Sequence, residues 1–169
     1  MPRKKKGCGD GIAIRGMFRL HVVDPDGTVA HDSGWQKNIV VDNGFTQYMV
    51  KALGSSADAG SLTHIALGSD TVAVSASQTA MVSEITKTNG SYVRTTFSTS
   101  TSAKSLAIYA TWAASWNTDV TGSSCRIGQV GLFNSSATGT LFAAQSFTAA
   151  TCTNNQAVNV TYNLAFATA

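Results

Sequence analysis

Hydrophobic and polar residues alternate along much of this chain with a period of two, which is typical of β-strands with one buried face. The pattern is clearest over residues 105–113 and 157–166, where every second residue is apolar. Similar but shorter patterns occur elsewhere. The remaining strand candidates are residues 16–23, 28–31, 33–41, 62–67, 91–100, 125–133 and 140–147.

Turn residues separate these runs. The segment Asp24-Pro25-Asp26-Gly27 combines a proline that presets φ with a glycine that accepts positive φ, so it predicts a β-hairpin between the first two strands. One segment has a helical period instead. It begins after Asp42 or Asn43 as the N-cap and ends at Gly54. Its apolar stripe, which we expect to pack in the core, consists of Phe45, Tyr48, Met49, Ala52 and Leu53.

Eight or nine short strands, one helix and frequent turns predict a mainly β protein: an antiparallel, jelly-roll-like β-sandwich with one short α-helix and an extended N-terminal arm. The chain of 169 residues is long enough to bury a core. We expect residues 1–15 to form a basic, glycine-rich arm and residues 16–169 to form a single β-sandwich domain.

Charge is scarce and unevenly placed. Asp, Glu, Lys and Arg make up 12% of the chain, about half the usual ~25%, and Thr, Ser, Ala, Asn and Gly take their place. Low charge is typical of surfaces that become interface cores. Four of the twelve cations fall within the first six residues, and the rest of the chain carries eight cations and nine acids. The four cations at the N-terminus are Arg3, Lys4, Lys5 and Lys6.

Three interpretations of this basic run remain open: a solvated tail, a contact with an acidic protein surface, or a contact with nucleic acid. The run has no interleaved aromatic residues, so it is a weak signal for nucleic acid. We expect it to bind an acidic surface on a neighbouring subunit. The basic start is not followed by an apolar stretch, and no run approaches the ~20 apolar residues of a membrane span. We therefore expect synthesis in the cytoplasm, no signal peptide and no membrane partner.

The sequence contains no motif for catalysis, and we expect a protein that is not an enzyme and needs no cofactor. It has no GxSxG, HExxH or phosphate-binding loop. Asp24 and Asp26 flank a proline and are better explained as turn formers than as calcium ligands. His31, Asp32 and Ser33 are consecutive, so on a strand they point to opposite faces and do not form a triad.

The three cysteines, Cys8, Cys125 and Cys152, have no metal-binding spacing. Either Cys125 pairs with Cys152, leaving Cys8 free, or all three stay reduced, which we favour. Three tryptophans have different expected roles. We expect Trp35 and Trp112 to anchor the core, and Trp116, in a polar loop, to lie at a surface that contacts a partner.

Three stretches share an order with a known group of proteins. They are residues 33–44, with Asn38-Ile39-Val40-Val41-Asp42-Asn43-Gly44; residues 65–85, with Ala66-Leu67-Gly68-Ser69; and residues 127–143, with Gln129-Val130-Gly131-Leu132. This order resembles small bacteriophage virion proteins of the tail-fibre or decoration type over residues 33–147. Gln129 departs from the pattern, which often has an acid there, and the basic arm has no counterpart. The resemblance implies a β-sandwich, a multicopy assembly and no catalysis.

These observations favour a structural subunit of a bacteriophage virion, placed as a capsid decoration or cement protein. Its expected partners are copies of itself and other virion proteins, the major capsid or tail proteins, reached through the arm and loops. The alternative is a tail or tail-fibre component that binds glycans or the host surface through Trp116 and three loops. Those loops are residues 54–61, 115–124 and 134–139. A hydrolase-like enzyme is the third and weakest hypothesis.

Overall fold

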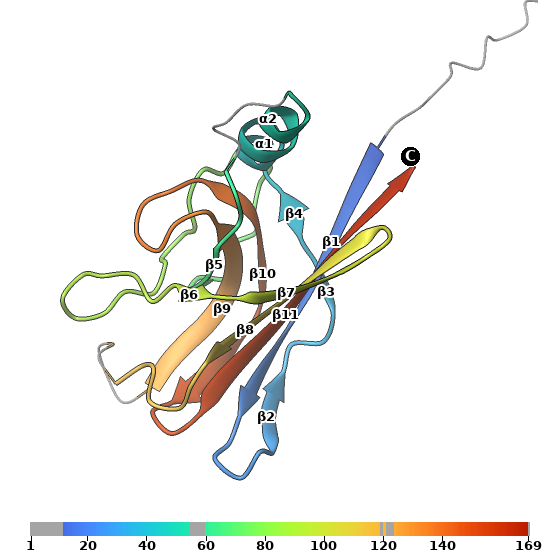
Figure 1. Cartoon of the computed structure of the whole chain (residues 1–169). Helices are drawn as coiled ribbons and strands as arrows, with labels where there is room; N and C mark the ends of the chain where they lie inside the picture. Colours follow the sequence, from blue (N-terminus) through green and yellow to red (C-terminus); the bar gives the residue numbers. More distant parts are fainter. Residues whose placement is uncertain (1–11, 55–59, 119, 121–123, 169) are drawn as a thin grey trace, which may run out of the picture.

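Two antiparallel sheets packed face to face form the molecule, which confirms the predicted β-sandwich (Figure 1). The computed structural model describes residues 12–54, 60–118, 120 and 124–168. The strands are β1 (Ile12–Val23), β2 (Val29–Asp32), β3 (Gln36–Lys37), β4 (Ile39–Val40), β5 (His64–Gly68), β6 (Thr95–Thr96), β7 (Ser98–Ser102), β8 (Ser105–Trp112), β9 (Ser124–Phe133), β10 (Leu141–Thr153) and β11 (Ala157–Thr168).

The six-stranded sheet has the order β2-β1-β11-β8-β7, with β3 also paired to β1, and the five-stranded sheet has the order β4-β10-β9-β5-β6. The chain switches sheets at Asn38, between β3 and β4, and at Phe97, between β6 and β7. It switches again between β8 and β9 and between β10 and β11. Strand pairs are nested along the sequence: β1 with β11, β4 with β10, β5 with β9 and β7 with β8. Nested antiparallel pairs are the feature that the fold shares with a jelly roll.

The central core lies between the sheets and uses the alternating residues that the sequence predicts. Ile108 on β8 and Tyr162 on β11 are fully buried, and Phe18 on β1 joins them. The Phe18 ring packs on Tyr162 at 6.0 Å and edge-on to Phe147 of β10 at 5.6 Å. Trp112 is also buried, as predicted, and its indole N–H donates to the Val93 carbonyl at 2.9 Å.

A second, smaller core covers the outer face of the five-stranded sheet. The long connection between β5 and β6 folds back over that face, so that Val74 and Met81 pack against Phe133 and Leu141. This explains why residues 127–133 of β9 are buried on both faces. The Gln129 side chain is buried there, and its Oε1 accepts a hydrogen bond from the Val82 backbone N–H at 3.1 Å. Gln129 therefore fastens the covering connection to the sheet.

The helical segment lies where the sequence predicts it, but its packing differs. It consists of α1 (Asp42–Gly44), a π-helical turn η1 (Phe45–Val50) and α2 (Lys51–Leu53). Its N-cap is Val41, and no side chain caps it, so the predicted cap at Asp42 or Asn43 is wrong. Of the predicted apolar stripe, Tyr48 is buried and Met49 packs against the core. The other members, Phe45, Ala52 and Leu53, are exposed, so only part of the predicted stripe is buried.

Several strands also differ in extent from their predicted ranges. Strand β1 includes Ile12–Arg15, which the sequence analysis assigned to the arm, and these residues pair with Ala165–Thr168. The single strand predicted over 33–41 is divided into β3 and β4, which belong to different sheets. The hairpin turn is confirmed: the Gly27 N–H donates to the Asp24 carbonyl at 2.9 Å, and Gly27 has a φ of +89°.

Candidate functional site

The basic residues proposed to bind a partner, Arg3 and Lys4 to Lys6, lie outside the described residues, as does Cys8. Trp116 lies in the turn after β8. It is partly buried, packs against the central core, and has its ring centroid 6.5 Å from that of Trp112. Its indole nitrogen is enclosed, and only part of the ring reaches the surface.

Trp35 is the tryptophan that lies on the surface, and its prediction as a core anchor is wrong. It is 44% exposed, in the loop between β2 and β3. The preceding Gly34 has a φ of +64°, so the chain turns there before β3 begins at Gln36. The Ser33-Gly34 pair ahead of the tryptophan was the available signal for a turn, and the extended apolar run that follows it obscured that signal.

The two described cysteines face each other across neighbouring strands. Cys125 on β9 is in register with Cys152 on β10, and both are buried free thiols. Burial, reinforced by the neighbouring thiol, raises the pKa of Cys125 to about 11, and burial raises the pKa of Cys152. Both thiols are therefore protonated and unreactive near neutral pH.

The carboxylates on the surface stabilise local structure. The Asp26 side chain accepts the Thr28 N–H at 2.8 Å within the hairpin turn, a bond that lowers the pKa of Asp26. Asp32 forms two hydrogen bonds with Arg19 and lies 3.3 Å from His21. The Arg19 guanidinium holds the pKa of Asp32 well below its usual range. Asp32 thus binds Arg19 and does not orient His31, so the three consecutive residues do not act as a triad.

A buried ion pair that the sequence analysis missed joins two loops. Arg94 Nε donates to Glu84 at 2.7 Å and an Nη donates to its other oxygen at 2.9 Å. The second Nη donates to the carbonyls of Ser135 and Thr138 at 2.9 and 3.2 Å. The guanidinium also lies 3.7 Å from the centre of the Phe133 ring. Four hydrogen bonds leave this arginine little capacity for a ligand.

No sequence pattern marked this pair, because its residues are ten apart on irregular chain and meet only in the folded sandwich. A pocket of about 510 Å³ adjoins it, lined among others by Tyr92, Met81 and Gly139. The walls of the pocket are held together by Arg94 itself. The arrangement is therefore suited to fixing the loop 134–139 against the connection between β5 and β6.

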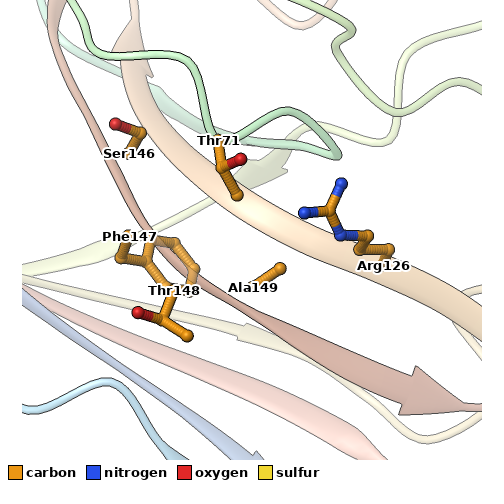
Figure 2. A pocket seen from close by; sticks show the side chains of 6 residues that line it. All are labelled: Thr71, Arg126, Ser146, Phe147, Thr148 and Ala149. Atoms are coloured by element: carbon orange, nitrogen blue, oxygen red, sulfur yellow. The ribbon is translucent and has the colours of Figure 1, made fainter.

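A second pocket, of about 400 Å³, lies at an irregularity in β10. Between Ser146 and Ala150 the strand has three residues opposite the single residue Gly128 of β9. Figure 2 shows the side chains of Ser146 to Ala149 along β10, with Thr71 and Arg126 across from them. Arg126 donates to the Ser69 carbonyl at 3.3 Å.

This pocket offers one cation among hydroxyl groups and no carboxylate in its lining. Arg126 is the charged side chain among the described residues of the lining, and Thr71, Ser146 and Thr148 supply its hydroxyl groups. In the part of the chain that the structure describes, no three His, Cys, Asp or Glu residues are grouped as metal ligands. The pocket can accept a carboxylate or another small anion, for example from the surface of a neighbouring protein.

The apolar side chains open to solvent form the other surface feature. Phe45, Val50 and Leu53 are exposed on the helical segment, with Leu53 at 78%. Among the described residues, no helix is long and apolar enough to cross a bilayer.

Comparisons of the chain with models of protein families, with curated proteins and with solved structures find no match.

Proposed function

We propose that this protein is a structural subunit of a bacteriophage virion, bound to the capsid as a decoration or cement protein. It belongs, on this proposal, to the assembled particle after synthesis in the host cytoplasm. Its partners are copies of itself and the major capsid or tail proteins. Three kinds of observation support this role: the rigid sandwich, the low surface charge, and the resemblance of residues 33–147 to small virion proteins.

The observation that carries the proposal is the presence of uncharged and apolar residues on the exposed surface. The charged groups that approach one another, Arg94 with Glu84 and Arg19 with Asp32, stabilise loops and the sheet. Exposed among the described residues are the uncharged strand β7 and apolar side chains such as Leu53 and Trp35. Such surfaces suit contacts with other protein subunits better than binding and turnover of a small substrate.

The basic arm is proposed to fasten the subunit to its neighbour. Its four cations precede β1 in the sequence. Strand β1 pairs with β11 along its whole length, from Ile12 to Val23. A body of nearly neutral charge would then be guided by the arm to an acidic patch on the capsid protein. Salt screens this attraction, because the Debye length of the solution shrinks from about 10 Å at 0.1 M salt to about 3 Å at 1 M salt.

Co-sedimentation with capsids tests the proposal. The capsids are assembled from the major capsid protein encoded in the same genome. We expect saturable binding at a fixed number of subunits per capsid protein, weakened in high salt. The variant with Arg3 and Lys4 to Lys6 replaced by alanine should bind more weakly, with less dependence on salt. Binding that neither saturates nor changes with salt would contradict the proposed attachment.

The alternative role, a tail or tail-fibre module that binds glycans, has one specific observation in its favour. Trp35 is exposed in a loop, where its ring is free to stack on a sugar. A glycan array probed with the intact protein and with Trp35→Ala tests this role, and Trp116→Ala tests the residue that the sequence favoured. Binding that is lost in either variant would support the module over the decoration protein.

A further inference from the structure

The β7 strand leaves one side of the six-stranded sheet open. Along one edge β7 pairs with β8, from Ser98 opposite Tyr109 to Ser102 opposite Ser105. Along the other edge it pairs with no strand in the described part of the chain, and no loop backbone there forms a hydrogen bond with it. All five residues of β7 are exposed, so both faces and the outer edge are accessible. In Figure 1 the β7–β8 hairpin, drawn in yellow, extends away from the five-stranded sheet.

This edge has none of the features that usually prevent strand pairing between molecules. Edge strands are normally protected by a lysine, a proline, a bulge or very short length. The sequence of β7, Ser98-Thr99-Ser100-Thr101-Ser102, contains no charge and no proline, and its pairing with β8 has no register shift. The backbone N–H and C=O groups on the outer edge are therefore free to pair with another strand.

The sequence of β7 is a palindrome, which fits a partner with the same strand. If two copies of β7 run antiparallel about a twofold axis at Ser100, every serine lies opposite a serine and Thr99 lies opposite Thr101 of the other copy. Threonine and serine pairs of this kind are favourable across antiparallel strands. No charged residue lies within β7, so no like charges meet along the paired strands.

We infer that two copies of this chain pair through their β7 strands and form one continuous sheet across a twofold axis at Ser100. The contact is isologous: both copies present the same surface. The inference deepens the proposed virion role, on which it rests for its biological setting, by naming the surface through which copies associate. The pairing itself is a property of the isolated protein and is tested without capsids.

Cysteine cross-linking tests the register. In a Cys8→Ser background, Ser100→Cys places two thiols opposite each other, with Cα atoms about 4.5–5.5 Å apart, within the range of a disulfide. Diamide as the oxidant accepts the two electrons and two protons that the thiols lose. Ser98→Cys is the matched control on the same exposed edge, since the two copies of that residue would lie about 13 Å apart.

We expect rapid formation of a disulfide-linked dimer with Ser100→Cys, little with Ser98→Cys, and a dimer again when Ser98→Cys is mixed with Ser102→Cys. Equal cross-linking of Ser100→Cys and Ser98→Cys would overturn the register.

A charge exchange tests the pairing without an oxidant. Ser100→Lys and Ser100→Glu should each be monomers by sedimentation, and an equimolar mixture should form dimers. A native protein that remains monomeric while binding capsids would overturn this inference and leave the virion role intact.

Discussion

At the scale of single residues, the protein uses its few charges in two different environments. Arg94 and Glu84 are almost fully buried, with 4% and 9% of their side chains exposed, whereas Arg19 and Asp32 are 37% and 35% exposed. A buried pair loses its hydration and depends on its partner, while water and salt screen an exposed pair. The two pairs have similar geometry and should therefore differ greatly in how much they matter.

Replacing Arg94 by methionine should lower the free energy of unfolding by about 3–5 kcal/mol, because it leaves the Glu84 carboxylate buried without a partner. Urea denaturation monitored by tryptophan fluorescence measures the change. Arg19→Met is the matched control and should leave the urea midpoint almost unchanged. Equal losses in the two variants would contradict the distinction between the pairs.

The buried thiols predict a dependence of stability on pH. The pKa of Cys125 rises from an ordinary 9.0 to about 11 in the folded protein, and that of Tyr48 rises from 10.0 to about 12, both mainly through burial. The folded state therefore retains protons that the unfolded chain loses. The stabilisation is complete below about pH 9 and is lost progressively as the pH rises toward 11 and 12.

Urea midpoints measured near neutral pH and at increasing alkaline pH should fall over that window, and Cys125→Ala should make the fall less steep.

In a Cys8→Ser background, a thiol reagent should label Cys125 and Cys152 slowly in the native protein and rapidly after unfolding. Rapid labelling of the native protein near neutral pH would show that these thiols are accessible, contrary to their burial.

At the scale of elements, the sequence predicted those strands in which one face is buried and the other is open. The alternation in β8 and β11 survives in the structure, because Ile108 and Val160 face the core while Tyr109 and Thr161 face outward. The pattern fails where other forces act. Leu53 is exposed at the end of the helical segment, and the change of sheet at Asn38 divides one apolar run into two strands.

The irregularity in β10 provides a prediction at this scale. Gly128 lies opposite this irregularity and close to Asp70 and Thr71. A Cβ atom added to Gly128 would be 2.6 Å from the Asp70 carbonyl oxygen and 2.7 Å from Thr71 Cγ2. Gly128→Ala should therefore lower the free energy of unfolding by about 1–3 kcal/mol through overpacking. In Gly54→Ala the nearest atom would be 3.3 Å away, and thermal unfolding should show a much smaller effect. Similar losses for both would mean that the loop adapts to the added methyl group.

Leu53 offers a second prediction about an element. Its side chain is 78% exposed on α2, although the helical pattern assigns it to the core. Leu53→Ser should change the free energy of unfolding by less than about 0.5 kcal/mol, as for most surface substitutions. Tyr48→Ala, on the buried side, should cost about 3–5 kcal/mol, by analogy with other buried aromatic truncations, and it also removes a 2.7 Å hydrogen bond to the Thr140 carbonyl. A large loss for Leu53→Ser would place this residue in the core after all.

At the scale of the whole molecule, the sequence was sufficient for the architecture and insufficient for the sites. Strand periodicity and turn residues are local signals, so a sandwich follows from them. The sites depend on contacts between distant segments, which no local pattern encodes. They are the Arg94–Glu84 pair, the hydrogen bond from the Val82 N–H to Gln129, and the pocket beside Gly128. The open edge of β7 was likewise visible only once the strand order was known.

The central claim, that this sandwich is a structural part of a phage particle, is tested most directly by electron cryo-microscopy of capsids incubated with the intact protein. The capsids should be assembled from the major capsid protein of the same genome. The account predicts density for two packed sheets at regular positions on the capsid lattice, with the first residues of β1 directed toward an acidic patch. Capsids that stay bare at saturating protein concentration would contradict the claim.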